Sequence, residues 1–183
     1  MRLAGIRDGS RILEVAIGSG ELFRELCSQN PSGLTTGVDF SSRMAARTLK
    51  TTVQEFPAAR IACAASDARS LPFADGTFHN IFVCFLLELV PADGVVEALA
   101  ECRRVLHPGG RLAMVLTGQD RPCFNLIYSQ CTRFAPSVWG RQIESKIPAL
   151  LQAARLGILH DVRTWQNGFP ARVLIAEPYF DPR

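Results

Sequence analysis

Three acidic side chains, Glu14, Asp39 and Asp67, each stand at or just beyond an apolar, strand-like segment. A carboxylate attracts an ammonium or sulfonium group and accepts hydrogen bonds from hydroxyl and amino groups. Ligands of open α/β sheets bind at the carboxyl ends of the strands, beside the point where the strand order reverses. We therefore expect the three carboxylates to gather at one edge of a sheet and to bind a positively charged nucleoside.

The segment that contains Glu14 runs into a glycine-rich turn, Ala16–Gly20, before an expected helix. Glycines let the backbone approach a ligand here, although a tight strand-to-helix turn alone explains any single one. The dinucleotide fingerprint GxGxxG requires a third glycine where this chain has Phe23, so a pyrophosphate cradle is not predicted. Glu14 would repel a pyrophosphate but attract a cation, and the helix N-terminus would accept a carboxylate.

The other two acids have ordinary explanations when each is taken alone. Asp39 follows the second expected strand, where an acid commonly accepts hydrogen bonds from ribose hydroxyls, but it could also cap a loop. Asp67 follows the third strand and could accept a hydrogen bond from the exocyclic amine of adenine, or could be a turn residue. Their convergence with the glycine turn favours the ligand interpretation.

Strand-like and helix-like segments alternate along the chain and would position these side chains. We expect strands at Arg11–Val15, Leu34–Val38, Arg60–Ala65, Asn80–Leu87, Leu112–Thr117, and near Leu159–Thr164 and Arg172–Ala176. We expect helices at Glu21–Gln29, Ser42–Glu55, Pro91–Leu106 with Asp93 as its N-cap, and Ile143–Leu156. The alternation predicts an α/β fold with a doubly wound, mostly parallel, seven-stranded sheet. The last two strands should form an antiparallel edge hairpin, because only a short loop separates them.

Composition indicates one globular domain over residues 1–183, because 48% of the residues are hydrophobic and 20% are charged. The net charge of +3 comes without a basic stripe, so no nucleic-acid partner is expected. The six cysteines form no CxxC pair, so we expect neither disulfides nor a metal site. With no signal segment and no apolar run of transmembrane length, a cytoplasmic protein without an integral membrane segment is expected.

As an ordered set, four stretches resemble the class I S-adenosylmethionine (SAM)-dependent methyltransferases, particularly the group with ubiquinone/menaquinone and phospholipid methyltransferases. These stretches are Ile12–Gly20, Gly37–Ser41, Ser66–Phe78 and Arg104–Leu112. The resemblance implies a Rossmann-like methyltransferase fold and SAM as the cofactor. It also implies methyl transfer to a small acceptor, which aromatic residues beyond the fifth strand suggest is hydrophobic or amphipathic: a lipid, a quinone precursor or an aromatic metabolite.

The resemblance also assigns roles by position. The cofactor's methionine moiety, ribose, adenine and methyl group would together be contacted by Glu14, Ala16, Gly18, Gly20, Asp39, Phe40, Met44, Asp67, Ala68, Cys84 and Phe85. Two departures from the family pattern are local: Ala16 replaces a glycine, and His79 replaces an acid at the far end of the sheet. A third is larger, because only about ten residues precede the first strand, where family members carry helices that cover the site. The chain is then a truncated form, or its pocket is open or covered by a partner.

Chemistry on the acceptor has two candidate side chains. Glu88, just beyond the fourth strand, is the best-placed titratable group, and Tyr128 could orient an acceptor; a solvated carboxylate and a core aromatic are the structural alternatives. Residues 118–141 could form an insert that covers the substrate.

An NAD-dependent oxidoreductase and a non-catalytic methyltransferase-like interaction domain are the competing functions. The chain could also form a homodimer.

Overall fold

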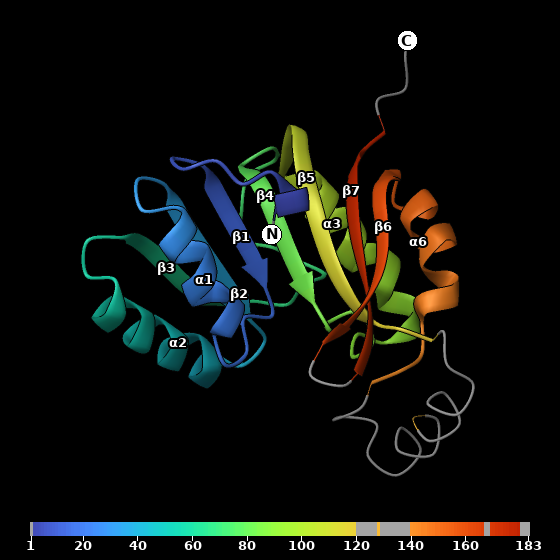
Figure 1. The fold of residues 1–183 in the computed structure, drawn as a ribbon, viewed down its shortest axis with the longest axis horizontal. Coiled ribbons are helices and arrows are strands. Elements are labelled where there is room, and N and C mark those ends of the chain that lie inside the picture. The colour runs from blue at the N-terminus through green and yellow to red at the C-terminus, as the bar shows by residue number, and fades with distance from the viewer. Residues whose placement is uncertain (1, 120–127, 129–139, 167–168, 180–183) are drawn as a thin grey trace.

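The computed structural model describes residues 2–119, 128, 140–166 and 169–179. A seven-stranded sheet of order β3-β2-β1-β4-β5-β7-β6 runs through the molecule (Figure 1). Its strands are β1 Arg11–Val15, β2 Leu34–Asp39, β3 Arg60–Ala65, β4 Phe78–Cys84, β5 Leu106–Thr117, β6 Leu156–Gln166 and β7 Phe169–Pro178. The first five are parallel, and β7 pairs antiparallel with both β5 and β6. The predicted fold class and its edge hairpin are confirmed.

The helices are α1 Glu21–Gln29, α2 Ser42–Glu55, α3 Val95–Val105 and α6 Ile147–Ala153, with short 3-10 turns η1 Arg2–Ala4, η2 Ala92–Gly94 and η3 Glu144–Lys146. The bounds predicted for α1, α2, β1 and β3 are confirmed. Local chemistry explains the start of α2, where the hydroxyl of Ser41 accepts a hydrogen bond from the N–H of Met44 at 3.3 Å.

Several predicted boundaries are wrong. The strand predicted from Leu112 begins earlier, at Leu106, and the helix predicted from Ile143 begins later, at Ile147. Three further differences have a visible local cause. Asp93 is not the N-cap of α3, which begins later at Val95 with Gly94 in the cap position and no side-chain cap, because η2 takes up the preceding residues. The fourth strand ends at Cys84 rather than Leu87, since Phe85 adopts a left-handed backbone with φ of 51°. The helix predicted through Leu156 ends at Ala153, just before Arg155 turns the chain with φ of 56°.

Apolar side chains from the two faces of the sheet form separate cores. On one face, the large core joins Leu13, Ile81, Met114 and Leu174 to residues of α3 and α6. On the other face, a smaller core contains Ile12, Phe82, Ala113 and Ile175, packed with Ala4 and Leu26. In Figure 1, α3 lies behind β5 and β7, whereas η1 is the described helical turn in front of β4 and β5. Among the described elements, no α-helix lies in front of β4, β5 and β7 in this view.

The strand order reverses between β1 and β4, which are neighbours in the sheet although β2 and β3 lie between them in sequence. In doubly wound sheets the loops at such a reversal diverge to opposite sides and leave a crevice at the carboxyl ends of the strands. The loops that follow Val15 and Cys84 bound this crevice, which is where the predicted acids should meet.

Candidate functional site

A cleft of about 530 Å³ lies at this reversal, and we call it the switch-point cleft. Apolar residues of the segment after β4, namely Leu86, Leu89, Val90 and Pro91, form part of its wall. Most residues expected to contact a cofactor also line it: Ala16, Gly18, Asp39, Phe40, Asp67, Ala68, Cys84 and Phe85. Ala16 and Phe85, which are 69 positions apart in the sequence, thus line one cavity, as the predicted fold requires.

The glycine-rich turn holds an open backbone at the floor of the cleft. Ala16 and Gly18 both have positive φ, 66° and 48°, and the N–H of Ala16 donates to the carbonyl of Val38 at 2.8 Å. A Cβ added at Gly18 would meet only the Ala16 carbonyl oxygen, at 4.0 Å, so it would project into free space. The absent side chain leaves a cradle against which a ligand can lie.

Asp39 is oriented by two backbone donors. One carboxylate oxygen accepts a hydrogen bond from the N–H of Gly18 at 2.9 Å, and the other accepts from the N–H of Ser41 at 2.9 Å. Each oxygen keeps a further lone pair, so the fixed carboxylate can accept two more hydrogen bonds from a ligand diol. The adjacent Phe40 is 81% exposed, which presents an aromatic face for stacking at the cleft.

Asp67 is held by a residue that the sequence analysis did not identify. Arg69 donates hydrogen bonds to both Asp67 oxygens, with the shortest at 2.7 Å, and these bonds lower the pKa of the carboxyl group. Arg69 lines the cleft as well. The pair fixes an ionised acceptor at the end of the cleft next to Ala68. Spacing alone offered a signal, because an arginine two residues after a turn aspartate can fold back onto it.

Glu14 faces an adjoining hollow of about 610 Å³, the sheet-face groove, which runs over the front of the sheet. The groove and the cleft share Ala16, Gly18, Cys84 and Phe85 in their linings. Glu14 is only 3% exposed, and its Oε2 has no hydrogen-bond partner among the described residues. Burial, and then the negative charge of Asp39, raise the pKa of Glu14 to about 8. A buried carboxylate without a partner is costly, and a cationic ligand would relieve that cost.

Gly20 and Met44 line neither hollow. Gly20 caps α1 with φ of 76°, and a Cβ added there would lie 2.5 Å from a methyl carbon of Thr48. Met44 contributes its backbone N–H to the cap of α2. Both positions thus have structural roles around the cleft.

Glu88 and Tyr128 also lie outside both linings. Glu88 is 4% exposed, burial raises its pKa, and one of its oxygens accepts a hydrogen bond from the N–H of Thr117 at 2.8 Å. Its backbone carbonyl accepts from the N–H of Arg141 at 2.8 Å, so Glu88 links both ends of the predicted insert. Tyr128 is buried, and burial raises its pKa. The rest of the 118–141 insert lies largely outside the described residues.

The histidines do not join this site. The Nδ1 of His79 accepts a hydrogen bond from the N–H of Arg11, at the opposite end of the strands, and its ring lies 5.3 Å from that of His107. Within the described parts of the chain, no three His, Cys, Asp or Glu side chains are grouped to hold a metal ion. No helix in those same parts has both the length and the apolar character needed to cross a bilayer.

Comparison of the sequence with known families gives a match between residues 12–110 and the model described as a methyltransferase domain. The ubiquinone/menaquinone biosynthesis C-methyltransferase UbiE of Paracoccus denitrificans is 34% identical over 131 residues, covering 66% of this chain and 52% of that protein. A demethylmenaquinone methyltransferase of Staphylococcus aureus is 34% identical over 144 residues, covering 77% and 57%. The chain thus spans little more than half the length of these relatives.

Solved structures share the fold at low sequence identity. A putative methyltransferase from Bacillus halodurans superposes with a TM-score of 0.81 at 14% identity, covering 98% of this chain and 97% of that one. A magnesium protoporphyrin IX methyltransferase from Synechocystis, solved with bound S-adenosylhomocysteine (SAH), gives a TM-score of 0.77 at 15% identity, covering 97% and 78%. These likenesses support the seven-stranded architecture independently of the sequence matches.

Proposed function

This chain belongs to the class I SAM-dependent methyltransferase superfamily, and from that membership we propose that it methylates a small, hydrophobic or amphipathic acceptor. The observation that carries the proposal is Glu14, a buried carboxylate with an oxygen that has no partner among the described residues, in the groove that adjoins the switch-point cleft. An amino-acid ammonium group beside a nucleoside would satisfy it, and SAM combines both groups. The residues present therefore fit the cofactor.

Each chemical group of the cofactor is suited by a different described side chain. The two free lone pairs of the Asp39 carboxylate suit the ribose hydroxyls, and Phe40 suits the face of the adenine ring. Asp67, kept ionised by Arg69, accepts from the exocyclic amine of adenine. Glu14 takes the ammonium group, and the N-terminus of α1 takes the carboxylate. SAM supplies an electrophilic methyl group on a sulfonium sulfur.

The protein's contribution to the reaction is then positioning and exclusion of water. With SAM bound, transfer of its methyl group to the acceptor would break the sulfur–carbon bond, leave SAH and release one proton from the acceptor. Holding both reactants in line supplies most of the acceleration in such a transfer. Glu88 and Tyr128 stay predictions as residues that act on the acceptor. Because Glu88 connects Thr117 and Arg141, we propose that it acts by positioning the segment between them.

The acceptor class follows from the walls of the two hollows. Leu86, Leu89 and Val90 line the cleft, and apolar side chains of β4, β5 and β7 line the groove. Two relatives that are 34% identical to this chain are named for ubiquinone/menaquinone biosynthesis and for demethylmenaquinone methylation. A quinone precursor or a comparable aromatic or lipid molecule therefore suits this site better than a sugar or a nucleic acid.

Two competing functions make different predictions. An NAD-dependent oxidoreductase would need a glycine where Phe23 is fully buried in the core under the turn. A non-catalytic interaction domain would bind SAM or no ligand without turnover. Thermal-shift measurements with SAM, SAH and NAD distinguish a methyltransferase from an NAD-dependent oxidoreductase, because only a true ligand stabilises the folded state by mass action. Conversion of SAM to SAH with a panel of quinols, phenols and lipids separates the second. Stabilisation by NAD alone would refute the proposal.

A further inference from the structure

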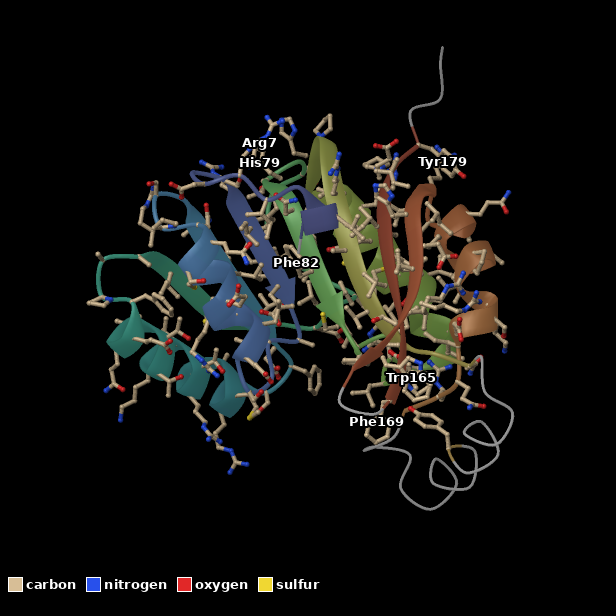
Figure 2. The ribbon with its side chains drawn as sticks, in the orientation of Figure 1. Arg7, His79, Phe82, Trp165, Phe169 and Tyr179 are labelled. Atoms are coloured by element: carbon tan, nitrogen blue, oxygen red, sulfur yellow. The ribbon has the colours of Figure 1, made fainter. Side chains whose placement is uncertain are left out.

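The sheet-face groove is a second binding hollow whose floor is formed by three adjacent strands. Phe82 of β4 is paired in register with Ala113 of β5, which is paired with Ile175 of β7. Val115 and Val173 form the next such pair on the same face, since residues two apart on a strand point the same way. All five line the groove, and Figure 2 places Phe82 near the middle of the sheet. The floor is thus a continuous apolar surface.

This groove opens directly into the switch-point cleft. Cys84 and Phe85, at the end of β4, line both hollows, as do Ala16 and Gly18 of the turn after β1. Phe85 is 40% exposed, and its N–H donates to the carbonyl of Val115 at 2.9 Å, which holds the junction against β5. A molecule lying on the floor of the groove can therefore present one atom at the junction while the rest of it remains on the sheet.

Charge limits which molecule fits. The groove is lined by two exposed carboxylates, those of Glu21 and Glu25, and its described lining contains no Lys, Arg or His. Glu14 also lines the groove but adds no net charge, because its pKa of about 8 keeps it protonated in the free protein and the ammonium group of the cofactor would pair with it in the complex. Glu21 and Glu25 project from α1 and are exposed at the rim. An acceptor that carries a carboxylate or phosphate would be repelled, whereas a neutral or cationic one would not.

We propose that the sheet-face groove binds the methyl acceptor, and that this acceptor is apolar and either uncharged or cationic. The inference rests on the proposed function and adds to it the place and the charge of the substrate. It assigns acceptor binding to the floor formed by Phe82, Ala113, Val115, Val173 and Ile175, with the reacting atom at the Cys84–Phe85 junction. The alternative is that the acceptor binds under the 118–141 insert instead of in the groove.

Two ring-matched probes test the charge and the place together. Protein saturated with SAH is titrated with neutral 1,4-dihydroxynaphthalene and with its carboxylated congener 1,4-dihydroxy-2-naphthoate, and methyl resonances of the alanine, valine and isoleucine side chains are followed by NMR. We expect the neutral probe to shift Ala113, Val115, Val173 and Ile175 and to bind at least tenfold more tightly than the carboxylate. At low salt, the double change Glu21→Gln with Glu25→Gln should reduce the difference in affinity between the neutral probe and the carboxylated probe.

Val173→Trp should fill the groove and weaken binding of the neutral probe at least tenfold. Val162→Trp is the matched control, because Val162 is paired with Val173 but lies one strand further out, 41% exposed and outside the lining. Both variants should retain SAH affinity within twofold, which also shows that they fold. Equal binding of the probe to both variants, or shifts that leave the four floor residues unchanged, would overturn the inference while leaving the methyltransferase proposal intact. Failure of the wild-type protein to bind SAH would instead remove the proposed function.

Discussion

Replacing Glu14 by glutamine should abolish a pH dependence of cofactor binding that the buried carboxylate creates. In the free protein the pKa of Glu14 is raised from 4.5 to about 8, so the group is protonated at neutral pH. An ammonium ligand favours the ionised form, so binding expels the proton. SAH affinity should therefore rise with pH between about 5 and 7.5, with a limiting slope of about tenfold per pH unit. Above pH about 8 the ligand's own α-amino group loses its proton, and the rise should stop.

The same residue links pH to folding. Because the folded pKa lies above the unfolded one, the stability contributed by Glu14 is fully present below pH 4.5 and is lost as the pH rises through about 8. The upper limit of this loss is about 5 kcal/mol, taken from the shift at 1.36 kcal/mol per pH unit. Without ligand, Glu14→Gln should lack this loss and should be the more stable protein above pH 8. Its SAH affinity should be lower and nearly independent of pH.

Isothermal titration of SAH in buffers of different ionisation enthalpy measures both the affinity and the released proton. We expect release of close to one proton per SAH at pH 6.5 for the wild type and of none for Glu14→Gln. Glu25→Gln, which removes an exposed carboxylate from the same groove, should behave like the wild type. The nucleoside 5′-methylthioadenosine carries no ammonium group and should bind without proton release. A wild-type protein that binds SAH with no proton release would refute the reasoning.

Three other perturbations have defined outcomes. Ala16→Gly should raise the unfolding free energy by about 1 kcal/mol in thermal or urea denaturation, because Ala16 pays for φ of 66° that glycine adopts freely; a loss of stability would contradict this. Asp39→Asn should weaken SAH at least tenfold by calorimetry, since an amide cannot accept from two N–H groups and from a diol together; unchanged affinity would contradict it. If the chain dimerises, we expect pairing of the β6 edge centred on Val162, which sets Asp161 opposite Arg163 of a second copy. Val162→Pro should then abolish the dimer in sedimentation, and a dimer that survives would contradict it.

The parts of the fold that are fixed locally could be predicted from the sequence. The glycine turn separates β1 from α1, the Asn30–Gly33 break ends α1, and the Ser41 cap begins α2, so each of these boundaries is set by a few neighbouring residues. The boundary at α3 could not be predicted, because Gly94 lies against Arg69 from another loop and that packing is invisible in the chain order. Helix propensity predicts that α3 exists, whereas tertiary contacts decide at which residue it begins.

The candidate site divides in the same way. Asp39 and Asp67 could be found because each follows its own strand, and the topology then brings them to one edge. The wall formed by Leu86–Pro91 could not, because an apolar run after β4 is equally typical of a continuing strand until Phe85 turns the backbone. Glu14 was predicted as a ligand to a cation, but its place in a separate groove depends on the alternation of side chains along β1.

Backbone strain connects these observations at one point. Ala16 and Phe85 both have positive φ, although neither is a glycine, and both line the junction of the cleft and the groove. Such conformations persist only where surrounding bonds hold them, here the hydrogen bonds to the carbonyls of Val38 and Val115. Those two carbonyls belong to β2 and β5, so the junction is held from both sides of the strand reversal. A rigid junction at that position is what an in-line transfer between two separately bound molecules requires, because misalignment of the reacting atoms by about 1 Å costs on the order of a hundredfold in rate.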